Sequence, residues 1–194
     1  MTARLLPTHP SVTLGVLAGG EGSRLGGRDK AWLERGGTPL VVALVDGLAA
    51  HVDAVLVSAN RNPENYLSHG LRAIHDEIHG IGPLGGLHAL AIACRTDWLL
   101  TLPVDVLALP GDLIQRLQAG EQGNYAVDDD GPQPLVARWR VVDLRRELPA
   151  AIASGDHAVH QLQARLDMTP VRFEQMRFGN LNSPEDLAAA GVEG

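Results

Sequence analysis

A group of glycines and cations follows the first apolar run of the chain, which covers residues 12–18. The glycines are Gly19, Gly20, Gly22, Gly26 and Gly27, and the cations are Arg24, Arg28 and Lys30. Glycine allows positive φ angles and lets another molecule approach the backbone closely. A strand that runs into a loop with accessible backbone N–H groups and cations is typical of phosphate-binding sites. We therefore expect this loop to hold the phosphates of a ligand.

Lys30 is the only lysine of the chain, because all other basic residues are arginines. An ammonium group is compact and strongly hydrated, whereas a guanidinium is a planar fork with fixed donor directions. We infer that Lys30 meets a phosphate or a metal-bound oxygen at a point where a guanidinium would not fit. The motif is not the P-loop G-x-x-x-x-G-K-[ST], since Ala31 follows the lysine.

Two carboxylates stand at the ends of predicted buried strands. Asp105 ends the apolar run 97–105, and Asp76 falls near the end of the shorter run 71–77. A single carboxylate can bind Mg²⁺ when waters and substrate phosphates complete the octahedral shell, so we expect Asp105 to bind Mg²⁺. Asp76 is expected to accept a hydrogen bond from a ribose hydroxyl or a base of the ligand, with the capping of a loop as the alternative.

The remaining polar residues favour structural roles. His75 and His79 lack the glutamate that follows the first histidine in the zinc-protease motif. The acidic run 128–130 beside Gly131 is predicted to be a solvated hairpin tip, and Cys94 is predicted to be a buried structural thiol. Since no nucleophile has an evident partner, the expected chemistry is direct transfer organised by positioning and charge neutralisation.

The elements that must position these residues alternate between strand and helix over the first 120 residues. Predicted helices cover residues 38–52, 62–70, 80–96 and 109–120, and predicted strands cover residues 12–18, 53–60, 71–77 and 97–105. This alternation predicts a parallel sheet covered on both faces by helices. Since ligands bind at the carboxyl ends of such strands, Gly19, Asp76 and Asp105 should converge with residues 58–60 in one crevice.

The last third of the chain is less regular. Residues 124–139 read as two strands around an Asp-Gly turn. Residues 141–155 and 156–166 read as helices, and residues 169–176, which contain a proline, as an edge strand. Ser183 is predicted to cap the last helix.

Together these patterns predict an α/β fold, a Rossmann-like three-layer sandwich whose sheet is mostly parallel, with an antiparallel or mixed portion in the last third. We expect one domain over residues 1–194, with a first, ligand-binding half at about 10–120 and a second half at about 121–194. Two local expectations are that Pro39 is the first residue of its helix and that Gly120 caps the helix of residues 109–120.

Composition limits the possible functions. The 194 residues are 45% hydrophobic and carry a formal net charge of −7, which suits a soluble globular protein. A general nucleic-acid surface is not expected, because it needs a broad basic face. The first residues lack the apolar segment of a signal peptide, and no run approaches the ~20 apolar residues of a membrane span. We therefore expect a cytoplasmic protein that binds neither nucleic acid nor membrane.

The order of the motifs resembles that of nucleotidyltransferases that join a nucleoside monophosphate to a phosphate or sugar phosphate. The chain is most similar to the MobA family of molybdenum cofactor guanylyltransferases. The resemblance covers nearly the whole chain and rests on the segments LAGGEGSRLGGRDKAWLERGGTPL, VLVSANR, GIGPLGGLHA, LPVD and FGNLNSPEDL. It implies transfer of GMP from GTP to the molybdopterin-bound molybdenum cofactor, which yields the guanine dinucleotide cofactor and pyrophosphate.

The resemblance also implies roles for individual residues. Catalysis falls on Arg24, Lys30 and Asp105, the two cations neutralising the leaving pyrophosphate and Asp105 binding Mg²⁺. The implied nucleotide-binding positions are Leu17, Ala18, Gly19, Gly20, Lys30, Ser58, Asn60, Asp76, Gly82, Gly85, Gly86 and Asp105. The implied acceptor-binding positions are Gln133, Pro134, Asn180 and Asn182. Other cofactor-assembly proteins and apo-molybdoenzymes are implied as partners.

The chain departs from the family pattern at three places. Ser58 replaces an asparagine, Leu107 replaces a proline, and DHAVHQ at residues 156–161 replaces adjacent arginines. Recognition of the base at Ser58 and Asn60 and recognition of the acceptor therefore stay open. One alternative is the same transfer from CTP. A second is a sugar-1-phosphate nucleotidyltransferase, which the short chain disfavours, and a third is a nucleotide-binding adaptor that has lost catalysis.

Overall fold

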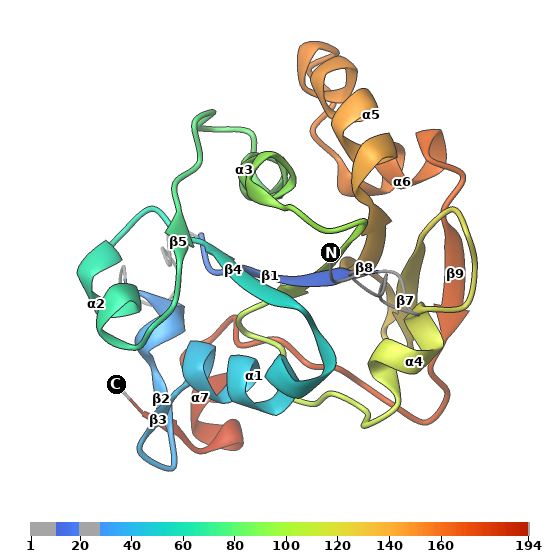
Figure 1. The fold of residues 1–194 in the computed structure, drawn as a ribbon. Coiled ribbons are helices and arrows are strands. Elements are labelled where there is room, and N and C mark those ends of the chain that lie inside the picture. Colours follow the sequence, from blue (N-terminus) through green and yellow to red (C-terminus); the bar gives the residue numbers. More distant parts are fainter. Residues whose placement is uncertain (1–10, 20–27, 194) are drawn as a thin grey trace, which may run out of the picture.

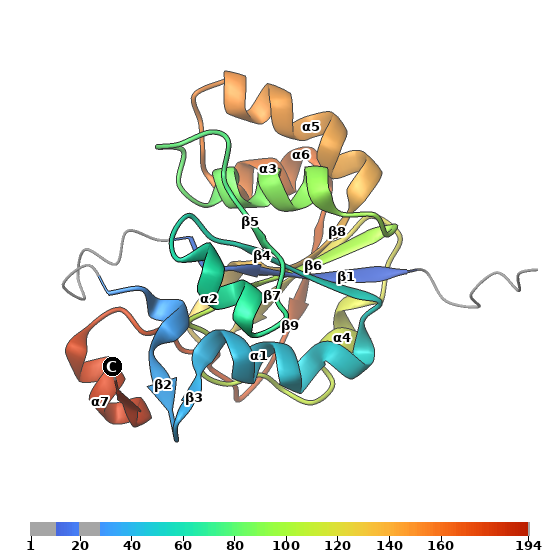
Figure 2. The same cartoon turned by 60° about the vertical axis from the view of Figure 1, so that its left-hand side comes forward.

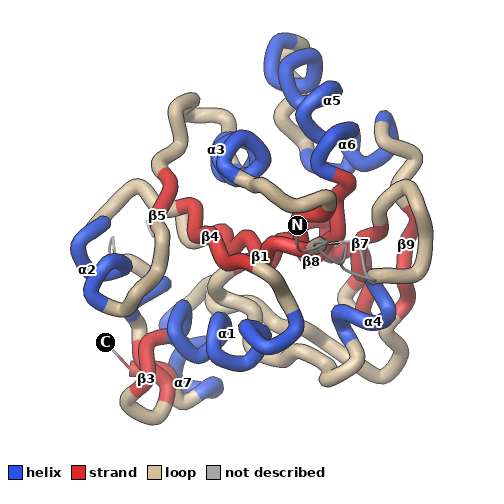
Figure 3. The backbone as a smooth tube through the Cα atoms, in the orientation of Figure 1, coloured by secondary structure: helices blue, strands red, loops and turns tan. Residues whose placement is uncertain are grey.

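The structure is a computed structural model that describes residues 11–19 and 28–193. In this part of the chain the main sheet has seven strands in the order β5-β4-β1-β6-β8-β7-β9 (Figures 1 and 3). The strands are β1 (Val12–Leu17), β4 (Ala54–Ser58), β5 (Ala73–Ile74), β6 (Trp98–Pro103), β7 (Asn124–Asp128), β8 (Gly131–Arg140) and β9 (Thr169–Arg172).

Within the main sheet, the strands from the first part of the chain pair in parallel. β1 lies between β4 and β6 and is parallel to both, and β5 extends the sheet in parallel beside β4. β8 is antiparallel to β6 and to β7, and β9 is parallel to β7 at the edge. This arrangement confirms the predicted mostly parallel sheet with a mixed portion in the last third.

The centre of the sheet is apolar because it is covered on both sides. The first five residues of β1 and of β6 are all buried, as expected for strands with no solvent-facing side. Figure 2 shows α3, α5 and α6 on one face and α1 and α4 on the other, which confirms the three layers. The helices are α1 (Leu40–Leu48), α2 (Pro63–Ser68), α3 (Pro83–Ala93), α4 (Leu113–Leu117), α5 (Val141–Ala153), α6 (Val159–Arg165) and α7 (Pro184–Ala190), with 3-10 turns η2 (Lys30–Trp32) and η3 (Ala49–His51).

A small second sheet corrects the prediction for Pro39. β2 (Glu34–Arg35) and β3 (Thr38–Pro39) form a hairpin, and β10 (Val192–Glu193) pairs with β2. The two residues of the turn, Gly36 and Gly37, have φ angles of 60° and 78°, which suit a tight hairpin. Strand pairing therefore continues through Pro39, and α1 begins one residue later than predicted, at Leu40.

The helix predicted over residues 109–120 is shorter than expected. α4 covers only Leu113–Leu117, and its C-cap is Gln118 rather than Gly120. Pro110 and Gly111 delay its start, because both residues disfavour the interior of a helix. Within the described ranges, no helix is long and apolar enough to cross a membrane.

The last helix begins as predicted. Ser183 is the N-cap of α7, and its hydroxyl accepts a hydrogen bond from the Asp186 N–H at 3.1 Å. The Asp186 carboxylate accepts from the backbone N–H groups of Ser183 at 2.8 Å and of Asn182 at 3.0 Å. This reciprocal capping box fixes the backbone just before the helix as well as the helix itself.

Replacing Ser183 by alanine removes one half of this capping box. We expect S183A to lower the free energy of unfolding by about 1 kcal/mol, the usual cost of losing an N-cap side chain. Urea unfolding followed by circular dichroism measures the change. S68A is the control, because the exposed Ser68 hydroxyl caps no helix N-terminus and contacts only the Asn65 carbonyl and the ring of the next residue, His69. An S183A effect no larger than that of S68A would contradict the capping role.

Candidate active site

The carboxyl ends of four strands meet at one edge of the sheet. Leu17 at the end of β1 pairs with Ser58 of β4 on one side and with Pro103 of β6 on the other. Ser58 in turn pairs with Ile74 at the end of β5. The polar residues that follow these strands therefore share one edge, as the alternation of strands and helices predicts.

Lys30 and Asp105 meet at this edge although 75 positions separate them in the sequence. The Lys30 ammonium donates to Asp105 Oδ2 at 2.7 Å, and the two side chains are 22% and 16% exposed. The ammonium also lies 3.4 Å from the Asn182 side-chain oxygen. The structure thus brings together a predicted phosphate ligand, a predicted metal ligand and a predicted acceptor contact.

The local backbone explains why Lys30 points there. Asp29 caps the 3-10 turn η2, and its side chain accepts a hydrogen bond from the Ala31 N–H at 3.2 Å. The second oxygen of Asp29 accepts from the Asn62 amide at 3.3 Å. Ala31 is fully buried, so the turn is anchored on both sides of the lysine. Lys30 is therefore held on an ordered turn close to the cavity described next.

A hydrogen-bonded cluster surrounds Asp76. Ser58 Oγ donates to one carboxylate oxygen at 2.8 Å, and the Asn60 amide donates to the other at 3.0 Å. The Asn60 side-chain oxygen accepts from the Asp76 N–H at 2.9 Å. The charged carboxylate is thus oriented through both of its oxygens before any ligand arrives.

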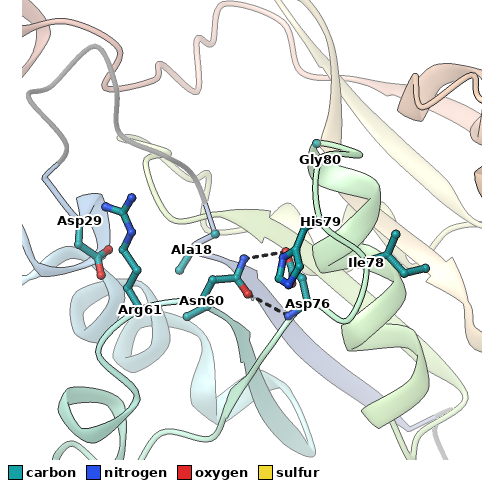
Figure 4. A pocket seen from close by; sticks show the side chains of 11 residues that line it. Ala18, Asp29, Asn60, Arg61, Asp76, Ile78, His79 and Gly80 are labelled. Carbon is teal, nitrogen blue, oxygen red and sulfur yellow. Dashed lines mark hydrogen bonds between the residues drawn. The ribbon is translucent and has the colours of Figure 1, made fainter.

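A cavity of about 490 Å³ opens beside this cluster, a size typical of small-molecule sites (Figure 4). Its lining residues are Ala18, Gly19, Asp29, Ala59, Asn60, Arg61, Asp76, Ile78, His79, Gly80 and Gly82. Arg61 and His79 line this cavity although neither was predicted as a site residue. The signal was present, since Arg61 directly follows Asn60 and His79 lies in the loop after a predicted strand end.

Ser58 does not line the cavity. Its side chain is fully buried, and its hydroxyl lies against Asp76 and under the start of α3. In this structure Ser58 orients Asp76, whereas Asn60 and Asp76 themselves face the cavity. A contact between Ser58 and a nucleotide stays a prediction.

Two glycines let α3 approach the strand ends. A Cβ atom on Gly86 would lie 2.6 Å from Ser58 Oγ and 2.9 Å from Leu17 Cδ2. A Cβ on Gly85 would lie 2.8 Å from the Ile78 carbonyl oxygen and 3.3 Å from Asp76 Oδ2. Both positions thus bring a Cβ within 3.0 Å of another heavy atom, which is closer than non-bonded contacts allow, so they require glycine for close packing.

The predicted acceptor residues divide into two groups. Asn180 forms a β-bridge with Val106, next to Asp105, and Asn182 contacts Lys30. Gln133 and Pro134 lie on β8. The Gln133 amide donates to Asp128 at 3.1 Å, and the Pro134 carbonyl accepts from Gln163 at 2.9 Å.

The prediction of a solvated acidic tip is wrong for Asp128. Its side chain is fully buried, while Asp129 and Asp130 remain at the turn and pair with Arg172 at 2.9 Å and Arg177 at 3.1 Å. Burial by itself raises the pKa of Asp128. Hydrogen bonds from Phe178, Gln133, Asp130 and Gly131 outweigh it, and the pKa lies below the ordinary value of 3.8. The carboxylate is therefore charged at neutral pH.

Other predictions have simpler outcomes. Cys94 is buried, as predicted. Across residues 11–19 and 28–193, no group of three or more His, Cys, Asp and Glu side chains could hold a metal ion. Gly20 and Arg24 lie outside the described residues, so their predicted roles stay predictions.

A family model and the sequences of curated relatives indicate the same family for this chain. The model of the MobA-like NTP transferase domain matches residues 14–169. A molybdenum cofactor guanylyltransferase of Cereibacter sphaeroides is 40% identical over 181 residues, which cover 90% of this chain and 93% of that protein. A protein of the same name from Yersinia pseudotuberculosis serotype O:1b (strain IP 31758) is 35% identical, with 92% and 94% covered.

Solved structures share the fold. Molybdopterin-guanine dinucleotide biosynthesis protein A from Archaeoglobus fulgidus superposes with a TM-score of 0.70 at 22% identity, covering 92% of this chain and 96% of that one. The 2-C-methyl-D-erythritol 4-phosphate cytidylyltransferase from Thermus thermophilus reaches 0.67 at 16% identity, with 91% and 96% covered. At these identities the two structures are evidence for the fold alone.

Replacing Gly86 by alanine tests the close approach of α3. The added methyl group must displace the Ser58 hydroxyl from Asp76 or push the helix away, so we expect G86A to destabilise the protein by about 1–3 kcal/mol. Urea unfolding measures it. The control is G47A, because a Cβ at Gly47 in α1 meets nothing within 4 Å. G47A should be neutral or stabilising, and an equal response of the two variants would contradict the packing argument.

Proposed function

This chain belongs to the MobA-like NTP transferase family and is a nucleotidyltransferase, and we propose that it transfers GMP from GTP to the molybdopterin-bound molybdenum cofactor. The products are the guanine dinucleotide cofactor and pyrophosphate. The observation that carries the proposal is the 2.7 Å contact between the single lysine, Lys30, and Asp105 beside a cavity of about 490 Å³.

The cavity suits the nucleoside part of GTP. Asp76 and Asn60 offer a carboxylate and an amide to the ribose or the base. Gly85 and Gly86 let the start of α3 lie close, and Gly82 lines the cavity without a side chain. Leu17, Ala18 and Gly19 lead from the end of β1 into the cationic loop that would receive the phosphates. The nucleotide would therefore extend from the Asp76 cluster toward Lys30.

The transfer is a displacement at the α-phosphorus of GTP. An oxygen of the acceptor's terminal phosphate forms the new bond, and the bond between the α-phosphorus and the bridging oxygen to the β-phosphorus breaks. Pyrophosphate leaves with that electron pair. The Lys30 ammonium stabilises the charge that develops on the leaving phosphates, as does Arg24 in our proposal. Holding both substrates in line supplies the rest of the rate enhancement.

Asp105 fits Mg²⁺ better than a metal held by the protein alone. Its carboxylate supplies hard oxygen ligands, and the described residues offer no cluster of three or more metal-binding side chains around it. Substrate phosphates and waters would complete the shell, as is usual for Mg²⁺. When bound, the ion would neutralise negative charge on the phosphates.

The second half of the chain would hold the acceptor. Asn180 bridges Val106 next to Asp105, and Asn182 contacts Lys30. The other two proposed acceptor residues, Gln133 and Pro134, lie on β8. We take residues 1–194 as one domain with a nucleotide half and an acceptor half. The reaction would take place in the cytoplasm, with cofactor-assembly proteins and apo-molybdoenzymes as further partners.

Asp105→Asn tests the catalytic role. We expect turnover to fall by about 10²–10³, because a group that orders charge at the reacting phosphates is lost while the shape of the side chain is kept. Pyrophosphate release with GTP, Mg²⁺ and the molybdopterin-bound acceptor measures it. Asp112→Asn is the control, since that carboxylate is exposed at the start of α4. Turnover of D105N within tenfold of the unsubstituted protein would reject the role.

Thermal unfolding with each nucleotide tests the choice of GTP. A ligand that binds only the native state at 100 times its Kd stabilises it by about 2.7 kcal/mol. We expect the melting temperature to rise more with GTP and Mg²⁺ than with CTP and Mg²⁺ at equal concentration. A larger rise with CTP would replace the guanylyl assignment by the cytidylyl one. Binding of GTP without pyrophosphate release in the presence of acceptor would favour the inactive adaptor.

A further inference from the structure

Asp128 is a buried carboxylate that no part of the proposed reaction uses. It ends β7, and its side chain has no solvent exposure. Burying a charged group is costly unless hydrogen bonds replace its water, so a carboxylate at such a position needs a reason beyond packing. Its hydrogen-bond donors come from two separate segments of the chain, and Asp128 joins these segments.

One oxygen of Asp128 organises the β7–β8 hairpin. Oδ1 accepts from the Asp130 N–H at 3.0 Å and from the Gln133 amide at 3.1 Å. The bond from the Asp130 N–H closes the turn, and the bond from the Gln133 amide fixes the side chain of Gln133 on β8. Gln133, a predicted acceptor residue, is thus oriented by Asp128.

The other oxygen reaches a segment 50 positions away in the sequence. Asp128 Oδ2 accepts from the Phe178 N–H at 2.8 Å, and Phe178 is fully buried. The carbonyl of the same residue accepts from the N–H groups of Leu107 and Ala108, both at 3.0 Å. Phe178 is therefore fixed on one side to Asp128 and on the other to the loop that follows Asp105.

The segment after Phe178 carries the other two predicted acceptor residues. Asn180 bridges Val106, and the Asn182 side chain lies 3.4 Å from the Lys30 ammonium. A continuous series of contacts thus runs from Asp128 through residues 178–182 to the Lys30–Asp105 pair. The Ser58, Asn60 and Asp76 cluster shares none of the contacts that Asp128 makes.

We propose that Asp128 is a positioning residue for the acceptor: it holds Gln133 on β8 and residues 178–182 beside the loop that follows Asp105, without touching either substrate. The inference rests on the proposed function for the identity of the acceptor. A carboxylate suits this task because its two oxygens accept from donors on two separate segments at once. An apolar residue would fill the same space but would leave the Phe178 N–H unpaired.

Asp128→Asn is the principal test. The side-chain NH₂ replaces one oxygen and must face a backbone donor, either the Phe178 N–H or the Asp130 N–H, so either residue 178 or the turn before Gln133 loses its hydrogen bond. We expect KM for the molybdopterin-bound acceptor to rise at least tenfold while KM for GTP stays within twofold. D130N is the control, since Asp130 sits on the same turn in an exposed pair with Arg177. An acceptor KM within twofold, or equal rises for both substrates, would overturn the proposal.

A double-mutant cycle identifies the route of the effect. If Asp128 acts by holding the segment of Asn182, D128N should cost much less once Asn182 is already alanine. We expect D128N to change the acceptor kcat/KM by less than threefold in the N182A background, against tenfold or more alone. Fully additive losses would overturn the positioning role.

Hydrogen exchange makes the test independent of the enzyme assay. In D128N the amide of Phe178 and those of residues 179–182 should exchange at least tenfold faster, with residues 54–58 unchanged. If the unsubstituted protein releases no pyrophosphate, the proposed function fails, and exchange alone decides whether Asp128 holds the segment. Should D128N not fold, Asp128→Ser, which keeps one acceptor oxygen, is measured instead. The same acceptor-specific loss and faster exchange of the Phe178 amide are expected, and equal loss for both substrates would overturn the proposal.

Discussion

The contact between Lys30 and Asp105 depends on the register of three parallel strands. Leu17 pairs with Ser58 and with Pro103, so β1, β4 and β6 end together and the loops that follow them begin at the same edge. If one strand slipped by one residue along its neighbours, its polar end residues would move relative to the shared edge. Every side chain of that strand would also point to the opposite face of the sheet. Close packing resists such a shift in β1, because a Cβ atom at the place of Gly15 would lie 2.9 Å from Leu99 Cδ1 and 3.0 Å from Leu90 Cδ1. The geometry of the site is thus a consequence of the packing of the core.

The two halves of the site are assembled by different kinds of interaction. The Asp76 cluster is built at short range, by Ser58 and Asn60 on a neighbouring strand end and by the close approach of α3 at Gly85 and Gly86. The proposed acceptor half is built at long range, through one buried carboxylate that joins the β7–β8 hairpin to Phe178. The Asp76 cluster thus depends on neighbouring strand ends, whereas the proposed acceptor half depends on contacts between late segments of the chain.

These differences explain what the sequence predicted and what it did not. Local patterns in the sequence predict where β1 ends and that Ser183 caps α7. Apolar runs, glycines and N-cap residues act on their immediate neighbours, so their effect can be read without the fold. The burial of Asp128 depends on Phe178, 50 positions later, and the concealment of Ser58 depends on Gly86. From the sequence alone, Asp128 beside a turn and Ser58 at a strand end are expected to be accessible. The segments that cover them lie far away in the sequence, so no local pattern indicates their burial.

Two of the three departures from the family pattern, Leu107 and residues 156–161, contact segments that carry proposed acceptor residues, whereas Ser58 belongs to the Asp76 cluster. Residues 156–161 lead into α6, which packs against β8, and Gln163 of that helix donates to the Pro134 carbonyl. Leu107 replaces a proline, and its N–H donates to the Phe178 carbonyl, a bond that proline could not form. This substitution therefore adds a hydrogen bond that fixes residue 178 beside Asp105. The segment that carries Asn180 and Asn182 is thus attached through its backbone to the loop that follows Asp105.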